Sequence, residues 1–67
     1  MFKENLFKSK LAEKSITLRE IAASIGCNEA TLYRKMKGQS DFTRNEIQLV
    51  KQKLGLSAAE VEAIFFA

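Results

Sequence analysis

Apolar residues recur along this chain with the spacing of amphipathic helices. Leu6, Phe7 and Leu11 fall at helical spacing in a predicted helix over 2–13, and four later segments repeat that periodicity. Those segments are 18–25, 29–37, 44–54 and 58–66, and their predicted inward residues are Ile21, Ala22, Ile25, Leu32, Met36, Ile47, Val50, Leu54, Val61, Ile64 and Phe65. No strand-like alternation competes with this pattern. The sequence therefore predicts an all-α fold of five helices in one domain over 1–67.

The starts and stops of these helices are marked by residues of suitable chemistry. The tetrapeptides TLRE, TRNE and SAAE, which begin at Thr17, Thr43 and Ser57, fit the capping box. In that motif the hydroxyl accepts a hydrogen bond from the third helical amide, and the glutamate accepts one from the cap amide. Asn28 is a fourth predicted N-cap, glycines follow three of the helices, and the chain has no proline. These signals predict short helices with short connections.

The segment 17–38 has the most specific pattern, two short helices joined by a tight turn. Ala22 is small enough for a close helix crossing, and Gly26 tolerates the positive φ that the turn requires. Cys27 is predicted to plug the turn as a small hydrophobe and not to act as a reactive thiol, because no histidine or second cysteine is present to activate it. The segment is interpreted as a helix-turn-helix, whose second helix commonly enters the major groove of DNA.

Composition limits the classes of function. The 67 residues are 28% charged with a net charge of +3, and a single cysteine excludes an internal disulfide. No apolar run reaches the roughly 18 residues of a membrane span, and the first ten residues lack the apolar centre of a signal peptide. Without histidine, a cysteine pair or a phosphate-binding glycine loop, we predict no enzyme, no cofactor, no metal and no small-molecule ligand. A cytoplasmic location is expected.

Charge is distributed unevenly along the chain. Basic residues concentrate in the first two thirds, whereas 57–67 carries only Glu60 and Glu62 as charges. This asymmetry favours one surface for phosphates and another for packing or for a protein partner. The alternative is a scatter of solvated surface charges without a binding role.

The pattern I-A-x-x-I-G-C-N-x-x-T-L-Y-R-K-M-x-G, within 17–56, resembles the lambda-repressor-like (Cro/C1-type) helix-turn-helix regulators of phages and bacteria. The resemblance implies a compact five-helix domain with the helix-turn-helix in its second and third helices. It also implies a sequence-specific DNA-binding transcriptional regulator, in particular a repressor, in a bacterial cell or phage-infected host. The chain departs from the family at Leu18, where relatives often have glutamine, and at Lys35, where an apolar residue is more usual.

If the helix over 29–37 lies in the major groove, its side chains that face away from Leu32 reach the base edges. The predicted base-reading residues are Glu29, Ala30, Thr31, Tyr33 and Arg34. Arg34 can contact guanine through two hydrogen bonds, Glu29 can accept one from cytosine, and the methyl group of Ala30 can meet that of thymine.

Contacts to the DNA backbone are predicted on both sides of this helix. The predicted backbone contacts are Thr17, Arg19, Lys35, Lys37, Ser40, Thr43 and Arg44. Simpler interpretations stay open for several residues. Tyr33 can instead pack against the following loop near Phe42, and Glu29 can serve only the electrostatics of the helix N-terminus. Arg34 and Lys35 can be solvated surface charges.

One module of this size contacts few base pairs, so a homodimer on a pseudo-palindromic operator is expected, with half-sites roughly 34 Å apart. The dimer contact is assigned to Ile64, Phe65 and Phe66, for which closure of the core is the alternative. Two other functions remain open. One is a protein-interaction module with Leu49, Phe65 and Phe66 as its apolar patch, and the other is an accessory, excisionase-like DNA-binding factor.

Overall fold

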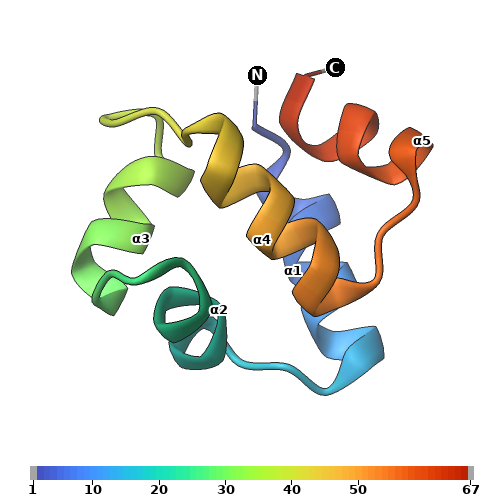
Figure 1. The fold of residues 1–67 in the computed structure, drawn as a ribbon, viewed down its shortest axis with the longest axis horizontal. Coiled ribbons are helices and arrows are strands. Elements are labelled where there is room, and N and C mark those ends of the chain that lie inside the picture. The colour runs from blue at the N-terminus through green and yellow to red at the C-terminus, as the bar shows by residue number, and fades with distance from the viewer. Residues whose placement is uncertain (1, 67) are drawn as a thin grey trace.

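Five α-helices and a closing π-helical segment make up the structure, a computed structural model that describes residues 2–66 (Figure 1). The elements are α1 (Glu4–Lys14), α2 (Leu18–Ile25), α3 (Glu29–Met36), α4 (Arg44–Leu54), α5 (Ala58–Val61) and the π-helical segment (Glu62–Phe66). No strand occurs within these residues. The prediction of an all-α fold with five helices is confirmed.

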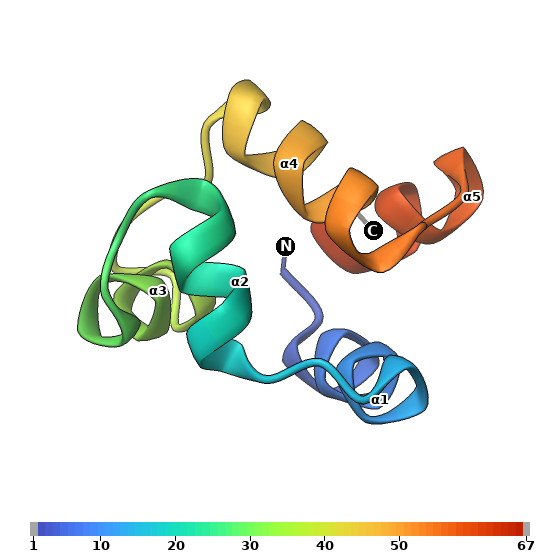
Figure 2. The same cartoon turned by 60° about the horizontal axis from the view of Figure 1, so that its bottom comes forward.

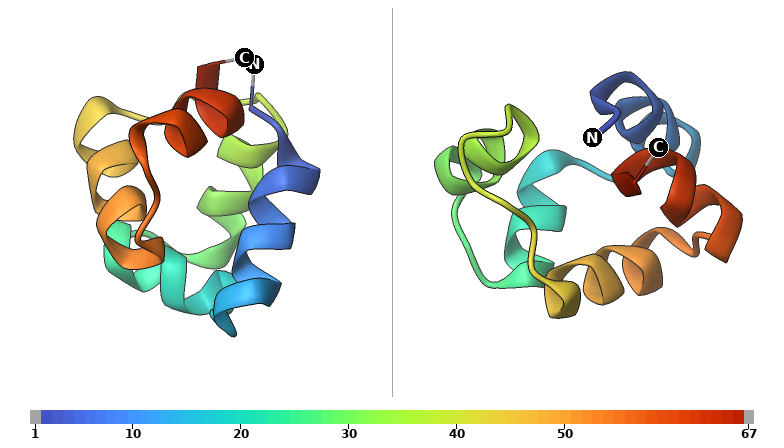
Figure 3. Two further views of the ribbon diagram at one scale, coloured as in Figure 1. Left: turned by 90° about the vertical axis from the view of Figure 1, so that its right-hand side faces the viewer. Right: turned by 90° about the horizontal axis from the view of Figure 1, so that it is seen from above.

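The two ends of the chain depart from the predicted helices. The helix predicted over 2–13 begins at Glu4, because Phe2 packs among other phenylalanines and the Lys3 amide donates to the Ile64 carbonyl at 2.7 Å. The helix predicted over 58–66 is α-helical only to Val61 and continues as a π-helix. The two ends of the described chain therefore lie beside one another (Figure 3).

All three predicted capping boxes form. The amides of Thr17, Thr43 and Ser57 donate to the carboxylates three residues on at 2.8, 2.9 and 2.8 Å. The hydroxyls of the same residues accept from the third helical amides at 3.1–3.2 Å. Asn28 accepts from the Thr31 amide at 2.8 Å, as predicted. The starts of α2 to α5 are thus satisfied by local hydrogen bonds.

The first four helices end in the same way. A residue in the left-handed conformation follows each helix or lies close after it, and the next amide donates a hydrogen bond to the carbonyl five residues earlier. Gly26 has a φ of 80°, and the next amide, that of Cys27, donates to the Ala22 carbonyl at 3.0 Å. Gly38 and Gly55 adopt the same conformation. Ser15 does so at the end of α1 with a φ of 56°, which no sequence signal predicted because a non-glycine residue is uncommon there.

One hydrophobic core joins all the helices. Helix α4 contacts both α2 and α1, and its residues Val50 and Leu54 are essentially inaccessible. The buried apolar residues are Phe7, Leu11, Ile21, Ala22, Ile25, Leu32, Met36, Val50, Leu54, Leu56, Ile64 and Phe65. Leu6, which shares helical spacing with Phe7 and Leu11, is exposed, because α1 turns the face that holds those two residues to the core.

Four phenylalanines from separate parts of the chain form a cluster at one end of this core. The ring of Phe2 lies 5.2 Å from Phe7, 5.1 Å from Phe42 and 5.3 Å from Phe65, measured between centroids. Phe42 and Phe65 meet edge to face at 5.2 Å. Such separations are typical of favourable aromatic pairs. The cluster holds the N-terminal extension, α1, the α3–α4 loop and the π-helical segment together.

The left-handed helix ends give a paired stability test. Gly26→Ala is expected to lower the free energy of unfolding by about 1 kcal/mol, because a side chain strains this backbone even though nothing lies within 4 Å of the added Cβ. Ser15→Gly is expected to raise it by about 0.5 kcal/mol, since relief of strain exceeds the extra entropy of glycine in the unfolded chain. Urea denaturation measures both. If both substitutions changed the free energy of unfolding in the same direction and by the same amount, this explanation of the helix ends would be wrong.

Glu60 gives a test based on pH. The Lys10 ammonium and the Ser57 amide both donate to its carboxylate and lower its pKa to about 2. Because this pKa lies below the ordinary value of 4.5, the interaction stabilises the fold above that pH and is lost as the pH falls towards 2.

Urea denaturation at a series of pH values between about 5 and 2 measures this effect. Glu60→Gln is expected to lose less stability over that range than the wild type does. Glu62→Gln, which changes an exposed carboxylate two residues on, is the matched control and is expected to keep the wild-type pH dependence. Parallel pH profiles for wild type and Glu60→Gln would count against the assigned contacts.

Candidate nucleic-acid interface

Helix α3 lies at the edge of the molecule and turns one face outward (Figures 1 and 2). Its inward face holds Leu32 and Met36, both buried. Of the predicted base-reading residues, Glu29, Ala30, Tyr33 and Arg34 are exposed and Thr31 is partly buried. The structure therefore brings this set to one solvent-facing side. Phe42 pairs with other phenylalanines, whereas Tyr33 is 42% exposed, so the structure does not place Tyr33 among the aromatic rings near Phe42.

The connection between α2 and α3 is short and packed. It consists of Gly26, Cys27 and Asn28, and Cys27 is partly buried against the core. Burial raises the pKa of the Cys27 thiol, with a further contribution from nearby Glu46, so the thiol is protonated at neutral pH. These features agree with the predicted structural role of Cys27. Together with Leu32, they hold α3 in one orientation on α2.

Lys35 occupies a different place from the one predicted. It is 9% exposed, its ammonium lies 3.1 Å from the Glu46 carboxylate, and it donates to the Asp41 carbonyl at 3.0 Å. The side chain turns inward because it follows the same face of α3 as Leu32 and Met36. Its charge is paired with Glu46 inside the protein, so the Lys35 ammonium does not lie at the surface with the other predicted backbone contacts.

Glu46 links this interior contact to the start of α4. Its carboxylate accepts from the Thr43 amide at 2.9 Å and pairs with Lys35. Burial raises the pKa of Glu46, but the hydrogen bonds from Thr43 and Lys35 and the charge of Lys35 outweigh burial and lower it overall. The end of α3 and the start of α4 are thus joined through one ionised carboxylate.

Ion pairs flank the exposed face of α3 at both of its ends. At its N-terminal end, Arg19 of α2 lies 3.5 Å from Glu29. At its C-terminal end, Lys37 and Lys8 both contact Glu4, at 3.0 and 2.8 Å. Lys8 was not among the predicted site residues, although its spacing of four from Glu4 on one helix signals that pair. The structure adds Lys8 to the basic residues near this face.

The other predicted backbone contacts, at the α3–α4 loop and at the start of α2, differ in how available they are. Ser40 and Arg44 are exposed. The Thr43 hydroxyl accepts from the Glu46 amide, and the Thr17 hydroxyl both accepts from the Glu20 amide and donates to the Glu20 carboxylate. Both threonines therefore serve their helix caps in the free protein.

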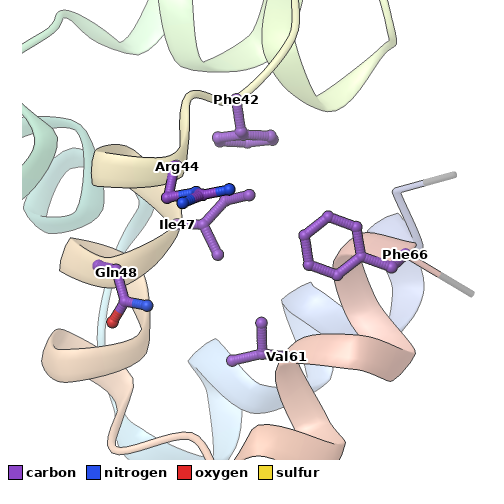
Figure 4. A pocket seen from close by; sticks show the side chains of 6 residues that line it. All are labelled: Phe42, Arg44, Ile47, Gln48, Val61 and Phe66. Atoms are coloured by element: carbon purple, nitrogen blue, oxygen red, sulfur yellow. The ribbon is translucent and has the colours of Figure 1, made fainter.

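An apolar groove lies between α4 and the C-terminal segment. Figure 4 shows its lining residues, Phe42, Arg44, Ile47, Gln48, Val61 and Phe66. Phe66 is 56% exposed at the edge of this groove, whereas Ile64 and Phe65 are buried in the core. Of the three residues predicted as a dimer contact, only Phe66 is therefore exposed, because the π-helical segment turns its two neighbours inward.

Among the described residues, no helix has the length and apolar character needed to cross a membrane, and no group of three or more potential metal ligands is present. Comparison of the chain with protein-family models, curated proteins and solved structures finds no match. Its function is therefore inferred from its own residues and their geometry.

Proposed function

We propose that this protein is a sequence-specific, double-stranded-DNA-binding transcriptional regulator, in which α2 and α3 act as a helix-turn-helix. The observation that carries the proposal is the division of α3 into two faces. Leu32 and Met36 hold one face on the core, while the opposite face exposes polar side chains that match hydrogen-bonding patterns in the major groove. The short turn through Gly26 gives α3 a defined orientation on α2.

Within this proposal, Arg34 is the principal base-reading residue. It is exposed, and its guanidinium donates to the Thr31 hydroxyl at 3.3 Å, a contact that restricts its direction. The Glu29 carboxylate accepts a hydrogen bond from the amino group of cytosine, and the Ala30 methyl group contacts the methyl group of thymine. Tyr33 lies beside them on the same face. Base reading by Glu29 requires release of the exposed Arg19 contact, which is weak in water. Arg19 is then available to a phosphate.

The backbone contacts of the proposal are the exposed basic and polar residues on either side of α3. They are Arg19, Lys37, Ser40 and Arg44, with the caps Thr17 and Thr43 beside them. Lys35 is omitted because Glu46 already neutralises it in the interior. The resemblance of 17–56 to the Cro/C1-type regulators extends the proposal to a cytoplasmic regulator of a bacterial cell or an infecting phage, in particular a repressor.

A salt titration separates DNA binding from the second candidate, a protein-interaction module that uses the apolar groove around Phe66. That alternative is favoured by one observation, the exposure of Phe66 beside Phe42, Ile47 and Val61. A DNA-binding protein loses affinity for duplex steeply with salt, by about 0.9 in the log–log slope for each phosphate contact. Absence of that dependence would favour the interaction module.

Arg34→Ala tests base reading. Duplexes bound by the wild type are first selected from a random pool, and affinities are then measured by fluorescence anisotropy. The variant is expected to lose about 1–3 kcal/mol on the selected duplex and little on random duplex, with preference relaxed at one base position. Lys53→Ala, an exposed basic residue on α4, is the matched control. A uniform loss on all duplexes would instead make Arg34 a backbone contact, as in an accessory DNA-binding factor.

We also propose a homodimer on a two-fold operator, with Phe66 of each copy seated in the groove of the other. Phe66→Ser is expected to abolish two-copy binding on the selected duplex, as measured by sedimentation, while the melting temperature stays within a few degrees of the wild type. Leu6→Ser, at another exposed apolar residue, is the control. Two wild-type copies that bind independently, or a Phe66→Ser variant that still binds as a pair, would contradict this interface.

A further inference from the structure

Two lysines near the exposed face of α3 share one carboxylate. Lys8 lies 2.8 Å from Glu4 on α1, and Lys37, the residue after α3, donates to both oxygens of Glu4 at 3.0 and 3.2 Å. The contact bridges the N-terminal half of α1 and the residue that follows α3, through the long side chain of Lys37. We call Glu4, Lys8 and Lys37 the shared-carboxylate cluster.

The two lysines of this cluster are more exposed to solvent than its carboxylate is. The side chains of Lys8 and Lys37 are 49% and 54% exposed, whereas that of Glu4 is only 24% exposed. Each ammonium carries three donors, and one carboxylate cannot satisfy them all. The cluster has a net charge of +1 and retains donors that point to solvent, so it can accept a second anion.

The cluster lies at the edge of the proposed DNA-binding face. The Lys37 amide donates to the Tyr33 carbonyl at 2.9 Å, and Lys8 shares the Glu4 carboxylate with Lys37, so the cluster adjoins the end of α3 that carries Tyr33. Tyr33 belongs to the exposed face of α3. A DNA backbone that borders a groove filled by α3 would therefore pass the two lysines.

A second cluster on α1 has the opposite charge balance and faces elsewhere. Lys10 contacts both Glu13 and Glu60, so that cluster has a net charge of −1 and joins α1 to α5. The positive cluster thus lies where α1 meets the end of α3, and the negative cluster lies where α1 meets α5. The Lys10 cluster supplies controls of the same residue types on the same helix.

We propose that Lys8 and Lys37 together bind one backbone phosphate of duplex DNA, and that Glu4 competes with this phosphate for the two lysines. The proposal rests on the proposed function and extends the binding surface to α1, outside 17–38. On binding, the phosphate takes over donors that Glu4 holds in the free protein. Glu4 therefore lowers affinity for every duplex, whatever its sequence, since a phosphate contact does not report the base.

The test compares charge variants on the two sides of α1. Affinity for the selected duplex and for random duplex is measured over a range of salt concentrations. Lys8→Gln and Lys37→Gln are each expected to reduce the log–log salt slope by up to about 0.9, whereas Lys10→Gln leaves it near the wild-type value. Glu4→Gln is expected to raise affinity for both duplexes about 1.5- to 5-fold, the range set by exposed ion pairs, and Glu13→Gln has a smaller effect.

Lys8→Arg keeps the charge and is expected to retain the wild-type slope, which separates loss of charge from any folding defect. If Lys8→Gln and Lys37→Gln keep the wild-type slope and Glu4→Gln matches Glu13→Gln, the shared-carboxylate cluster does not bind phosphate and the inference is overturned. A wild-type protein with a steep salt dependence would in that case still support DNA binding. A wild-type protein that shows no salt-dependent duplex binding overturns both the proposed function and this inference.

Discussion

The interior face of α3 is the constraint on which the proposed site depends. This helix has eight residues, and a helix of that length is not stable alone in water. Leu32 and Met36 attach it to the core, and Lys35 reaches Glu46 at the start of the next helix. The exposed side chains of α3 hold their relative positions only because its other face is packed and its buried charge is neutralised.

Several glutamates serve two contacts at once. Glu46 caps α4 and neutralises Lys35, while Glu60 caps α5 and holds Lys10 of α1. Each carboxylate therefore satisfies a helix end and also joins two elements of the fold. In a chain with net charge +3, this use of acidic residues leaves the excess basic charge at exposed edges, where it is available to an anionic partner.

A chain of 67 residues has a small interior, and the aromatic cluster shows how its ends contribute to it. Phe2 and Phe65, from opposite ends of the chain, contact each other and also contact Phe42 in the loop that follows α3. The loop beside the proposed DNA-binding face is thus supported by both ends. Phe66, the next residue, is exposed. Phe65 therefore closes the core, while Phe66 remains available for the proposed dimer contact.

Local patterns in the sequence determined the five helices, the three capping boxes and the exposed face of α3, because these depend on residues a few positions apart. Tertiary packing alone decided the rest. It buried Lys35, divided Phe65 from Phe66, and joined Glu4 to Lys37 across 33 positions. Periodicity shows that a face is apolar or polar, but it does not show which distant carboxylate lies opposite a lysine. Those pairings arise only when the helices pack, and they determine which charges remain free to bind.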